Sequence, residues 1–235
     1  MKTNYILLLL ALFAAFPIHA ELGYVETIGQ ERFTGDIVIS SGALEVTDTN
    51  RLATNKVGIA QLKTMCLLPS NTNASAARGV LLINGTCFAG KVEAADDTVL
   101  RFPKSSKIDP VSMHRIARIL LRPVPDSAFQ TVSSRRGLLL RNNDFVDGEL
   151  KALKDGRIKI ESVLFGSRTF QASDVAAIVL RDAEPAECRF EVRTRDNSLL
   201  RLSDVTLAKN EFVLSEPILG SWRLRASDLL ALKRN

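Results

Sequence analysis

Leu164-Phe165-Gly166-Ser167 and Ala172-Ser173-Asp174-Val175 return as Ile218-Leu219-Gly220-Ser221 and Ala226-Ser227-Asp228-Leu229, at a constant shift of 54 positions. Earlier in the chain, the stretch from Arg136 to Asn142 follows the pattern of Arg78 to Asn84 at a shift of 58 positions. Recurrence at this spacing is typical of one small structural unit that is used several times. The sequence therefore predicts a chain made of similar consecutive copies.

Each copy has the features of several short β-strands. Asn84-Gly85 and Asp196-Asn197 are residues that close hairpin turns. Ile158-Lys159-Ile160-Glu161 alternates apolar and charged side chains, as a half-buried strand does. The Ser-Asp pair before the final strand, at Ser173-Asp174 in the third copy, predicts one helical turn capped by these two side chains.

A glycine in the second strand marks the expected bend of each copy. It stands at Gly35, Gly90 and Gly148 in the first three copies, whereas Leu202 occupies this place in the last copy. Because glycine eases sharp backbone bends, we expect the second strand of the last copy to bend less sharply.

Five strands with a helical turn before the last are the plan of a small, strongly bent β-barrel. The pattern resembles Sm-like and Src-homology-type (SH3-like) barrels. It is most similar to tandem small-barrel modules of bacterial envelope proteins, through Asn84-Gly85-Thr86 with Gly90 and through Asn142-Asn143-Asp144 with Gly148. The resemblance covers the mature chain and implies an all-β fold of four tandem five-stranded barrels after a cleaved signal peptide.

The expected boundaries are a signal peptide at 1–20 and four barrel copies at 21–68, 78–122, 135–181 and 188–235, hereafter segments 1 to 4. The linkers between them are polar and lack helical periodicity. Units of this size are near the lower limit for a free-standing core, so we expect neighbouring copies to pack together. Grooves between copies are then the natural ligand sites.

The N-terminus has the pattern of an export signal. Lys2 precedes an apolar run from Ile6 to Phe16, and Ala20 provides a small residue for cleavage. The run is shorter than the roughly 20 residues of a spanning helix, although an uncleaved anchor is the alternative. Cys66 is the first cysteine, which argues against a lipid anchor. We expect an extracytoplasmic protein, periplasmic or secreted, with no membrane span after cleavage.

The charge and the cysteine content limit the class of protein to which the chain can belong. The chain has 31 Lys and Arg against 26 Asp and Glu, an excess too mild for a typical nucleic-acid binder. Cys66, Cys87 and Cys188 are the three cysteines. One disulfide, with Cys66 and Cys87 as the nearest pair, is one arrangement; the low cysteine content favours the other, in which all three are buried and unpaired.

Few residues suit catalysis. His19 is expected to leave with the signal, so the mature chain retains only His114, which argues against multi-histidine metal sites and against a Ser-His-Asp arrangement. Asp174 and Asp228 recur at equivalent places, but within the turn motif, which favours a structural role. The sequence predicts no enzyme, no metal site and no cofactor.

The candidate partner-binding residues belong to the last copy. Arg193 and Arg195 alternate with apolar residues, as do Arg223 and Arg225. If those strands share a face, the four arginines gather where they could meet anionic lipid headgroups, wall polymers or an acidic protein. The alternative is an ordinary solvated strand face. Trp222, the only tryptophan, is either an exposed partner anchor or a plug of the barrel mouth.

The leading functional hypothesis is an exported, non-enzymatic binding or scaffold protein of the cell envelope, whose partner is another envelope protein. The alternative is a binder of anionic wall or lipid polymers through the basic face of the last copy. RNA binding, implied by the Sm-like resemblance, is less favoured because the chain shows an export signal and no aromatic stacking platform. We therefore expect no nucleic-acid partner.

Overall fold

The computed structural model describes residues 20–40, 42–48, 50, 53–68, 78–104, 108–209 and 211–235. The protein is all-β, as the sequence predicts. The expected signal peptide, except Ala20, and the first linker at 69–77 lie outside the described residues. Within the described ranges, the structure contains no helix with the length and apolarity needed to cross a membrane.

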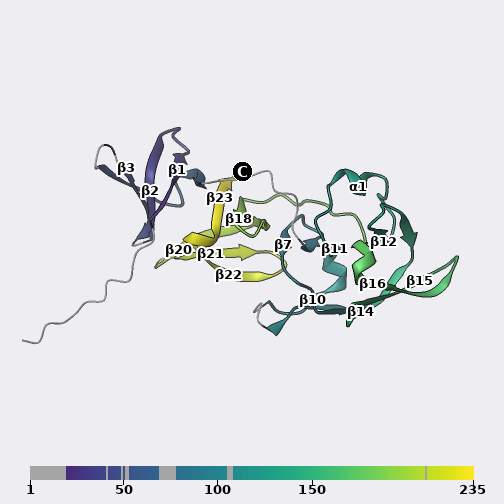
Figure 1. The fold of residues 1–235 in the computed structure, drawn as a ribbon. Helices are drawn as coiled ribbons and strands as arrows, with labels where there is room; N and C mark the ends of the chain where they lie inside the picture. The colour runs from purple at the N-terminus through teal and green to yellow at the C-terminus, as the bar shows by residue number, and fades with distance from the viewer. Residues whose placement is uncertain are drawn as a thin grey trace, which may run out of the picture.

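Segment 1 contains five strands, β1 (Glu21–Thr27), β2 (Arg32–Ser40), β3 (Ala43–Asp48), β4 (Ala53–Val57) and β5 (Leu62–Leu67). Segment 2 contains β6 (Gly79–Leu82), β7 (Cys87–Ala89), β8 (Ala94–Asp96), β9 (Val99–Arg101), β10 (Val111–Ser112), the 3-10 turn η2 (Met113–Arg115) and β11 (Ile116–Leu120). Figure 1 shows segment 1, in purple, at one end of the molecule.

Segment 3 contains β12 (Gly137–Leu140), β13 (Phe145–Asp147), β14 (Glu149–Lys154), β15 (Arg157–Ser162), β16 (Gly166–Gln171), η3 (Ala172–Asp174) and β17 (Val175–Val179). Segment 4 contains β18 (Phe190–Thr194), β19 (Leu199–Leu202), β20 (Asp204–Ala208), β21 (Glu211–Glu216), β22 (Gly220–Arg225), η4 (Ala226–Asp228) and β23 (Leu229–Arg234). Segments 2 to 4 thus share one order of elements.

The second strand of segments 2 to 4 is divided in two. Gly90 follows β7, and Gly148 separates β13 from β14. Segment 4 divides in the same way although it lacks the glycine, and β19 and β20 belong to different sheets. There the break falls at Ser203, whose backbone N–H and hydroxyl both donate to the Ser215 carbonyl oxygen at 3.0 Å. These bonds fix the backbone at the break between β19 and β20.

The predicted helical turn before the last strand is present in segments 2 to 4 as η2, η3 and η4. The predicted side-chain caps are absent from η3 and η4, because both turns begin at the alanine that precedes the Ser-Asp pair. Gln171 and Arg225 hold the cap positions of η3 and η4, without a side-chain cap bond. The Ser and Asp residues therefore lie inside the turns.

The pairing of strands contradicts the expected closed barrels. The strands form a sheet of fourteen, a sheet of six and a sheet of three. In segment 1 the order is β5-β1-β2-β3-β4, and β4 and β5 are not paired with each other among the described residues. The edges that would close each barrel instead pair with a neighbouring segment, or stay at a sheet edge.

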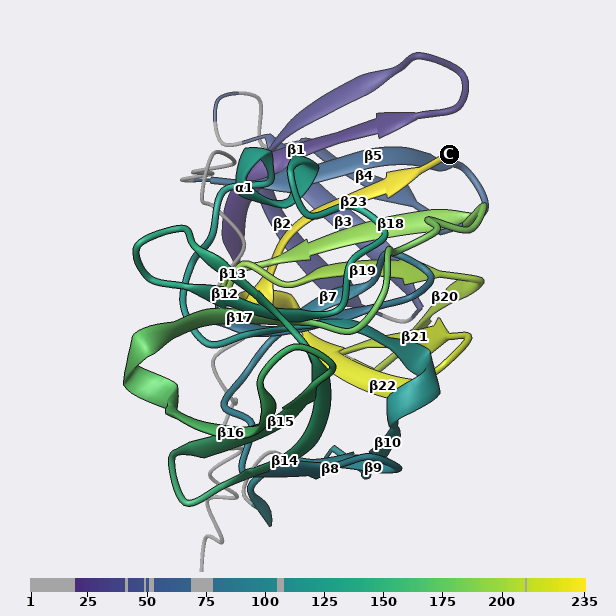
Figure 2. The ribbon, with the colours of Figure 1, turned by 90° about the vertical axis from the view of Figure 1, so that its right-hand side faces the viewer.

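The fourteen-stranded sheet orders the segments 3, 2, 4, 1. β11 pairs antiparallel with β17, β7 with β19, and β23 with β5, so the first and last segments are neighbours. In the six-stranded sheet, β8 and β14 join segments 2 and 3 a second time. Figure 2 shows this smaller sheet as a separate layer below the large one.

One apolar core runs through all four segments. Val25, Leu82, Ile158 and Phe212 are fully buried members of this single cluster. A second cluster surrounds Phe129 on the helical turn α1 (Ser127–Gln130). Here the expectation of a non-helical linker is wrong: Phe129 is buried, and the guanidinium carbon of Arg118 lies 4.1 Å from its ring centroid, which holds the linker against the sheet.

Candidate functional site

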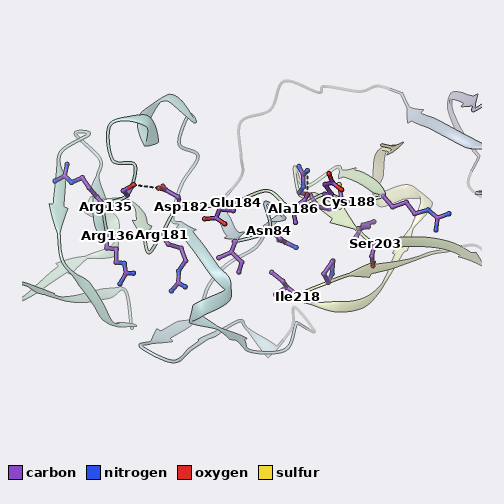
Figure 3. A pocket seen from close by; sticks show the side chains of 17 residues that line it. Asn84, Arg135, Arg136, Arg181, Asp182, Glu184, Ala186, Cys188, Ser203 and Ile218 are labelled. Carbon is purple, nitrogen blue, oxygen red and sulfur yellow. Dashed lines mark hydrogen bonds between the residues drawn. The ribbon is translucent and has the colours of Figure 1, made fainter.

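One cavity lies where segments 2, 3 and 4 meet, and has a volume of about 750 Å³. Its wall includes the first turn of segment 2, the start of segment 3, the linker before segment 4, and segment 4 itself (Figure 3). The lining residues include Ile83, Asn84, Arg135, Arg136, Arg181, Arg189, Arg201 and the acidic residues of the linker. The cavity is therefore a groove between copies, as the sequence predicts for ligand sites.

The linker before segment 4 forms one wall because it is bonded to segment 2. The backbone N–H of Glu184 donates to the Ile83 carbonyl at 2.8 Å, and that of Ala186 donates to the Asn84 carbonyl at 3.3 Å. Gly85, with φ of +86°, lets this linker approach closely, since a Cβ there would lie 3.1 Å from the Pro185 Cβ. The wall is thus fixed by main-chain contacts.

The opposite wall is held by Asp182. Its carboxylate accepts hydrogen bonds from the Ser134 backbone N–H at 2.8 Å and from the Ser133 hydroxyl at 3.1 Å. These bonds tie the end of segment 3 to its beginning. As a result, the neighbouring Arg135 and Arg136 lie at the cavity, where Figure 3 shows Arg136 and Arg181 pointing to one side and Arg135 pointing away.

The cavity arginines differ in their partners. Arg135 pairs with Asp147, whose hydrogen bond raises the pKa of Arg135. Arg189 lies 3.4 Å from Asp204, and Arg201 lies 3.9 Å from Glu191. By contrast, Arg181 donates to the His114 carbonyl oxygen at 2.9 Å, and neither it nor Arg136 has an ion pair among the residues that the structure describes. Two guanidinium groups are therefore not neutralised by a carboxylate within the described protein.

The lining combines charged and apolar groups. The lining includes five arginines, of which Arg135 points away, and three carboxylates, those of Asp182, Glu184 and Glu187, so the cavity carries charges of both signs. Ile83, Leu202, Pro217 and Ile218 add apolar surface. A polypeptide offers carbonyl oxygens, amide groups and side chains of every kind to such a surface, whereas a polyanion would meet the acidic residues unfavourably.

Three of the four arginines singled out from the sequence lie on strands of two different sheets, and the fourth, Arg195, follows one of these strands. Arg193 belongs to β18 in the large sheet and lies 3.8 Å from Glu191. Arg195 follows this strand and pairs with Glu21 of segment 1 at 2.9 Å. The structure thus places Arg195 at the junction of the first and last segments.

Arg223 and Arg225 lie on β22 in the three-stranded sheet. Arg225 is nevertheless close to Arg195, because the Arg195 backbone N–H donates to the carbonyl oxygen of Asp228 at 2.9 Å, and Asp228 is the ion-pair partner of Arg225. Arg223 is exposed and lies 3.4 Å from Glu211, while Arg225 pairs with Asp228 at 2.9 Å. Trp222 is half-buried, and its ring meets that of Phe88 edge-on with centroids 6.0 Å apart. Trp222 therefore takes part in the contact between segments 4 and 2.

The titratable residues considered for chemistry are dispersed. His114 is exposed in η2, with Nδ1 2.7 Å from the Ser112 hydroxyl, and Asp174 and Asp228 lie in separate turns. All three cysteines are free, with Cys66 and Cys87 buried and Cys188 half-buried. Among the described residues, no group of three or more His, Cys, Asp or Glu side chains is arranged to hold a metal ion.

Sequence reasoning missed the cavity residues and Glu216. Arg136 and Arg181 stand at the ends of segment 3, far apart in the sequence, and only the meeting of three segments brings them to one cavity. Glu216 falls where segment 3 has Ser162, and this replacement of a small residue by a carboxylate at a strand end was the available signal. Its burial, at 3% exposed, follows from contacts with segment 2.

No protein-family model matches the sequence, and no curated protein matches it significantly. The resemblance to tandem small-barrel envelope proteins therefore stays a prediction.

Proposed function

We propose that this chain is an exported, non-enzymatic binding or scaffold protein of the cell envelope, built from four repeated small β units. Its ligand is an extended segment of another envelope protein, which enters the cavity between segments 2, 3 and 4. The observation that carries the proposal is this cavity of about 750 Å³, with mixed charges, apolar residues and two arginines that have no ion pair among the residues that the structure describes. Its size is within the range of roughly 300 to 1,000 Å³ that is usual for ligand sites.

The test combines capture with a charge reversal in the cavity. Tagged mature protein is crosslinked gently in envelopes, captured, and its partners are identified; the crosslinked partner segment is then made as a peptide and titrated. Arg136→Glu is the main variant, because Arg136 is exposed and has no ion pair among the described residues. Arg157→Glu/Lys159→Glu, exposed on β15 outside the cavity, is the matched control.

We expect Arg136→Glu to weaken peptide binding about tenfold or more, as loss of a central arginine anchor does, and the control to leave it unchanged. A partner peptide that binds Arg136→Glu as well as the wild type would contradict the proposed site. Failure to capture any protein would contradict the scaffold function itself.

The alternative function is binding of anionic wall or lipid polymers by segment 4. Arg193, Arg223 and Arg225 are exposed, which supports it, although each has a carboxylate within 4.0 Å. Such binding to sacculi or anionic vesicles should fall steeply with added salt. Charge reversal of Arg223 and Arg225 should then reduce binding, whereas Arg136→Glu should not.

A further inference from the structure

The segments of this chain join through strands that hold the same place in each segment. The last strand of segment 2, β11, pairs with the last strand of segment 3, β17. In the same way, the last strand of segment 4, β23, pairs with the last strand of segment 1, β5. The first half of the divided second strand joins segments 2 and 4, where β7 pairs with β19. The second half joins segments 2 and 3, where β8 pairs with β14. All four junctions are antiparallel, so neighbouring segments are related by local two-fold axes.

The register of the pairs supports these axes. Ala95 is paired with Leu153, its counterpart at the shift of 58 positions. Cys87 corresponds to Phe145 at the same shift, and Phe145 corresponds to Leu199 at the shift of 54 positions. Cys87 and Leu199 are the residues paired between segments 2 and 4. Like residues therefore meet at these junctions.

The junction of segments 2 and 4 has a second component, the turn between β21 and β22. In this turn Ile218 and Leu219 are partly buried against the core, and Arg115 of segment 2 donates to the Ile218 carbonyl at 3.2 Å. Glu216 at the base of the turn is bonded to Asn84 of segment 2. β19, the first half of the divided second strand, and this turn together form the face by which segment 4 binds segment 2.

Segment 3 carries the same two components without a partner among the described residues. β13, the first half of its divided second strand, is the last strand of the large sheet and pairs only with β12. The turn between β15 and β16 presents Val163, Leu164 and Phe165, which are 104%, 78% and 58% exposed. Asp147 of β13 lines one hollow with Val163 and Leu164, so the edge and the turn adjoin. Figure 1 shows this hairpin at the end of the molecule away from segment 1.

The backbone of β13 is oriented for pairing. The Asp144 carbonyl accepts from the Leu140 N–H at 2.8 Å, and the Gly148 N–H donates to the Arg136 carbonyl at 3.0 Å. Since hydrogen bonding alternates along an antiparallel strand, the N–H and C=O groups of Phe145 and Asp147 face away from β12. Phe145 is the counterpart of Cys87 and Leu199, the residues that meet at the internal junction.

We propose that this face, β13 with the turn Val163–Phe165, binds a second copy of the chain about a two-fold axis. β13 would pair antiparallel with its counterpart, Phe145 opposite Phe145, and extend the large sheet across both chains. A second copy is the favoured occupant because all four internal junctions pair like with like, and a two-fold interface requires such a self-complementary face. Asp147 is already paired with Arg135 in its own chain, so the contact brings no unpaired carboxylates together.

The test uses the full mature chain in sedimentation velocity over a concentration series. The variant Val163→Ser/Leu164→Ser/Phe165→Ser removes the apolar turn at exposed positions, which spares the fold. Leu22→Ser/Ile28→Ser, at 49% and 56% exposed in segment 1, is the control for a general loss of surface apolarity. A second measurement places Phe145→Cys in a Cys188→Ser background and scores disulfide-linked dimers. Its control is Lys56→Cys on β4, the opposite edge of the sheet.

The wild type should form dimers, the turn variant should raise the dimer dissociation constant about tenfold or more, and the segment 1 control should not change it. Phe145→Cys should give covalent dimers, because directly opposed antiparallel residues meet the distance limits of a disulfide. A wild type that stays monomeric would overturn the proposal. So would dimers that survive the turn variant and do not crosslink through Cys at position 145.

Discussion

Glu216 of segment 4 is hydrogen bonded to Asn84 of segment 2, 132 positions earlier, with Nδ2 of the amide 2.6 Å from Oε1 of the carboxylate. The same oxygen accepts from the Thr86 hydroxyl at 3.0 Å, while the other oxygen accepts from the backbone N–H groups of Ile218 and Leu219. A carboxylate only 3% exposed is thereby satisfied from two segments at once. It holds segments 2 and 4 together beside the proposed ligand cavity.

Glu216→Ala should lower the free energy of unfolding by about 3 kcal/mol, because it leaves buried donors of two segments without an acceptor. Urea denaturation measures this loss. Glu211→Ala is the comparison, since Glu211 lies on the same strand and pairs with exposed Arg223. It should change the stability by less than about 0.5 kcal/mol. Equal effects of the two substitutions would refute the role given to Glu216.

Gly137→Ala should destabilise the protein by about 2 kcal/mol or more, because a Cβ there would lie 2.0 Å from the Val146 carbonyl oxygen. The residue also has φ of +154°, which disfavours any side chain. Gly58→Ala is the control: nothing lies within 4 Å of its added Cβ, and its effect should be neutral or slightly stabilising. Thermal or urea unfolding of the two variants decides the point.

Burial, with smaller contributions from Asp126 and Asp196, raises the pKa of the Cys87 thiol to about 11 from an ordinary value of 9.0. In the unfolded chain the thiol loses its proton near the ordinary value, while the folded protein keeps it protonated until the higher pH. The stability that this thiol provides is therefore complete below pH 9.0 and declines as the pH rises to about 11.

The wild type should lose about 2 kcal/mol more stability than Cys87→Ala between these two pH values. Urea denaturation of both proteins at a series of alkaline pH values measures the difference. Parallel stability curves would show that the thiol ionises as readily in the folded protein as in the unfolded chain.

The local structure was largely predictable, because strand alternation and turn residues act within a few positions. Ile158 to Glu161 forms part of β15, and the helical turns precede the last strands as expected. Barrel closure was not predictable, since an edge strand has the same sequence pattern whether it pairs within its segment or with a neighbour. β11 and β17 look like barrel-closing strands and instead pair with each other.

For the candidate site, the sequence predicted only its location in a groove between copies, and not the residues that line it. Arg136 and Arg181 are ordinary arginines in the sequence, and the order 3, 2, 4, 1 of the segments brings them to the cavity. Arg193 and Arg223 were selected because each alternates with apolar residues along its strand. They share this pattern but belong to different sheets. Periodicity shows which face of a strand a residue occupies, and not which strands become neighbours.

The cavity and the free face of segment 3 both depend on the order in which the segments are joined. The most direct test is Ala231→Cys, which places a thiol opposite the native Cys66 across the junction of segments 4 and 1. We predict that mild oxidation forms a disulfide between Cys66 and the new cysteine, detected by peptide mass spectrometry and lost in a Cys66→Ser background. A protein that keeps both thiols free under conditions that oxidise an unfolded control would contradict this order of segments.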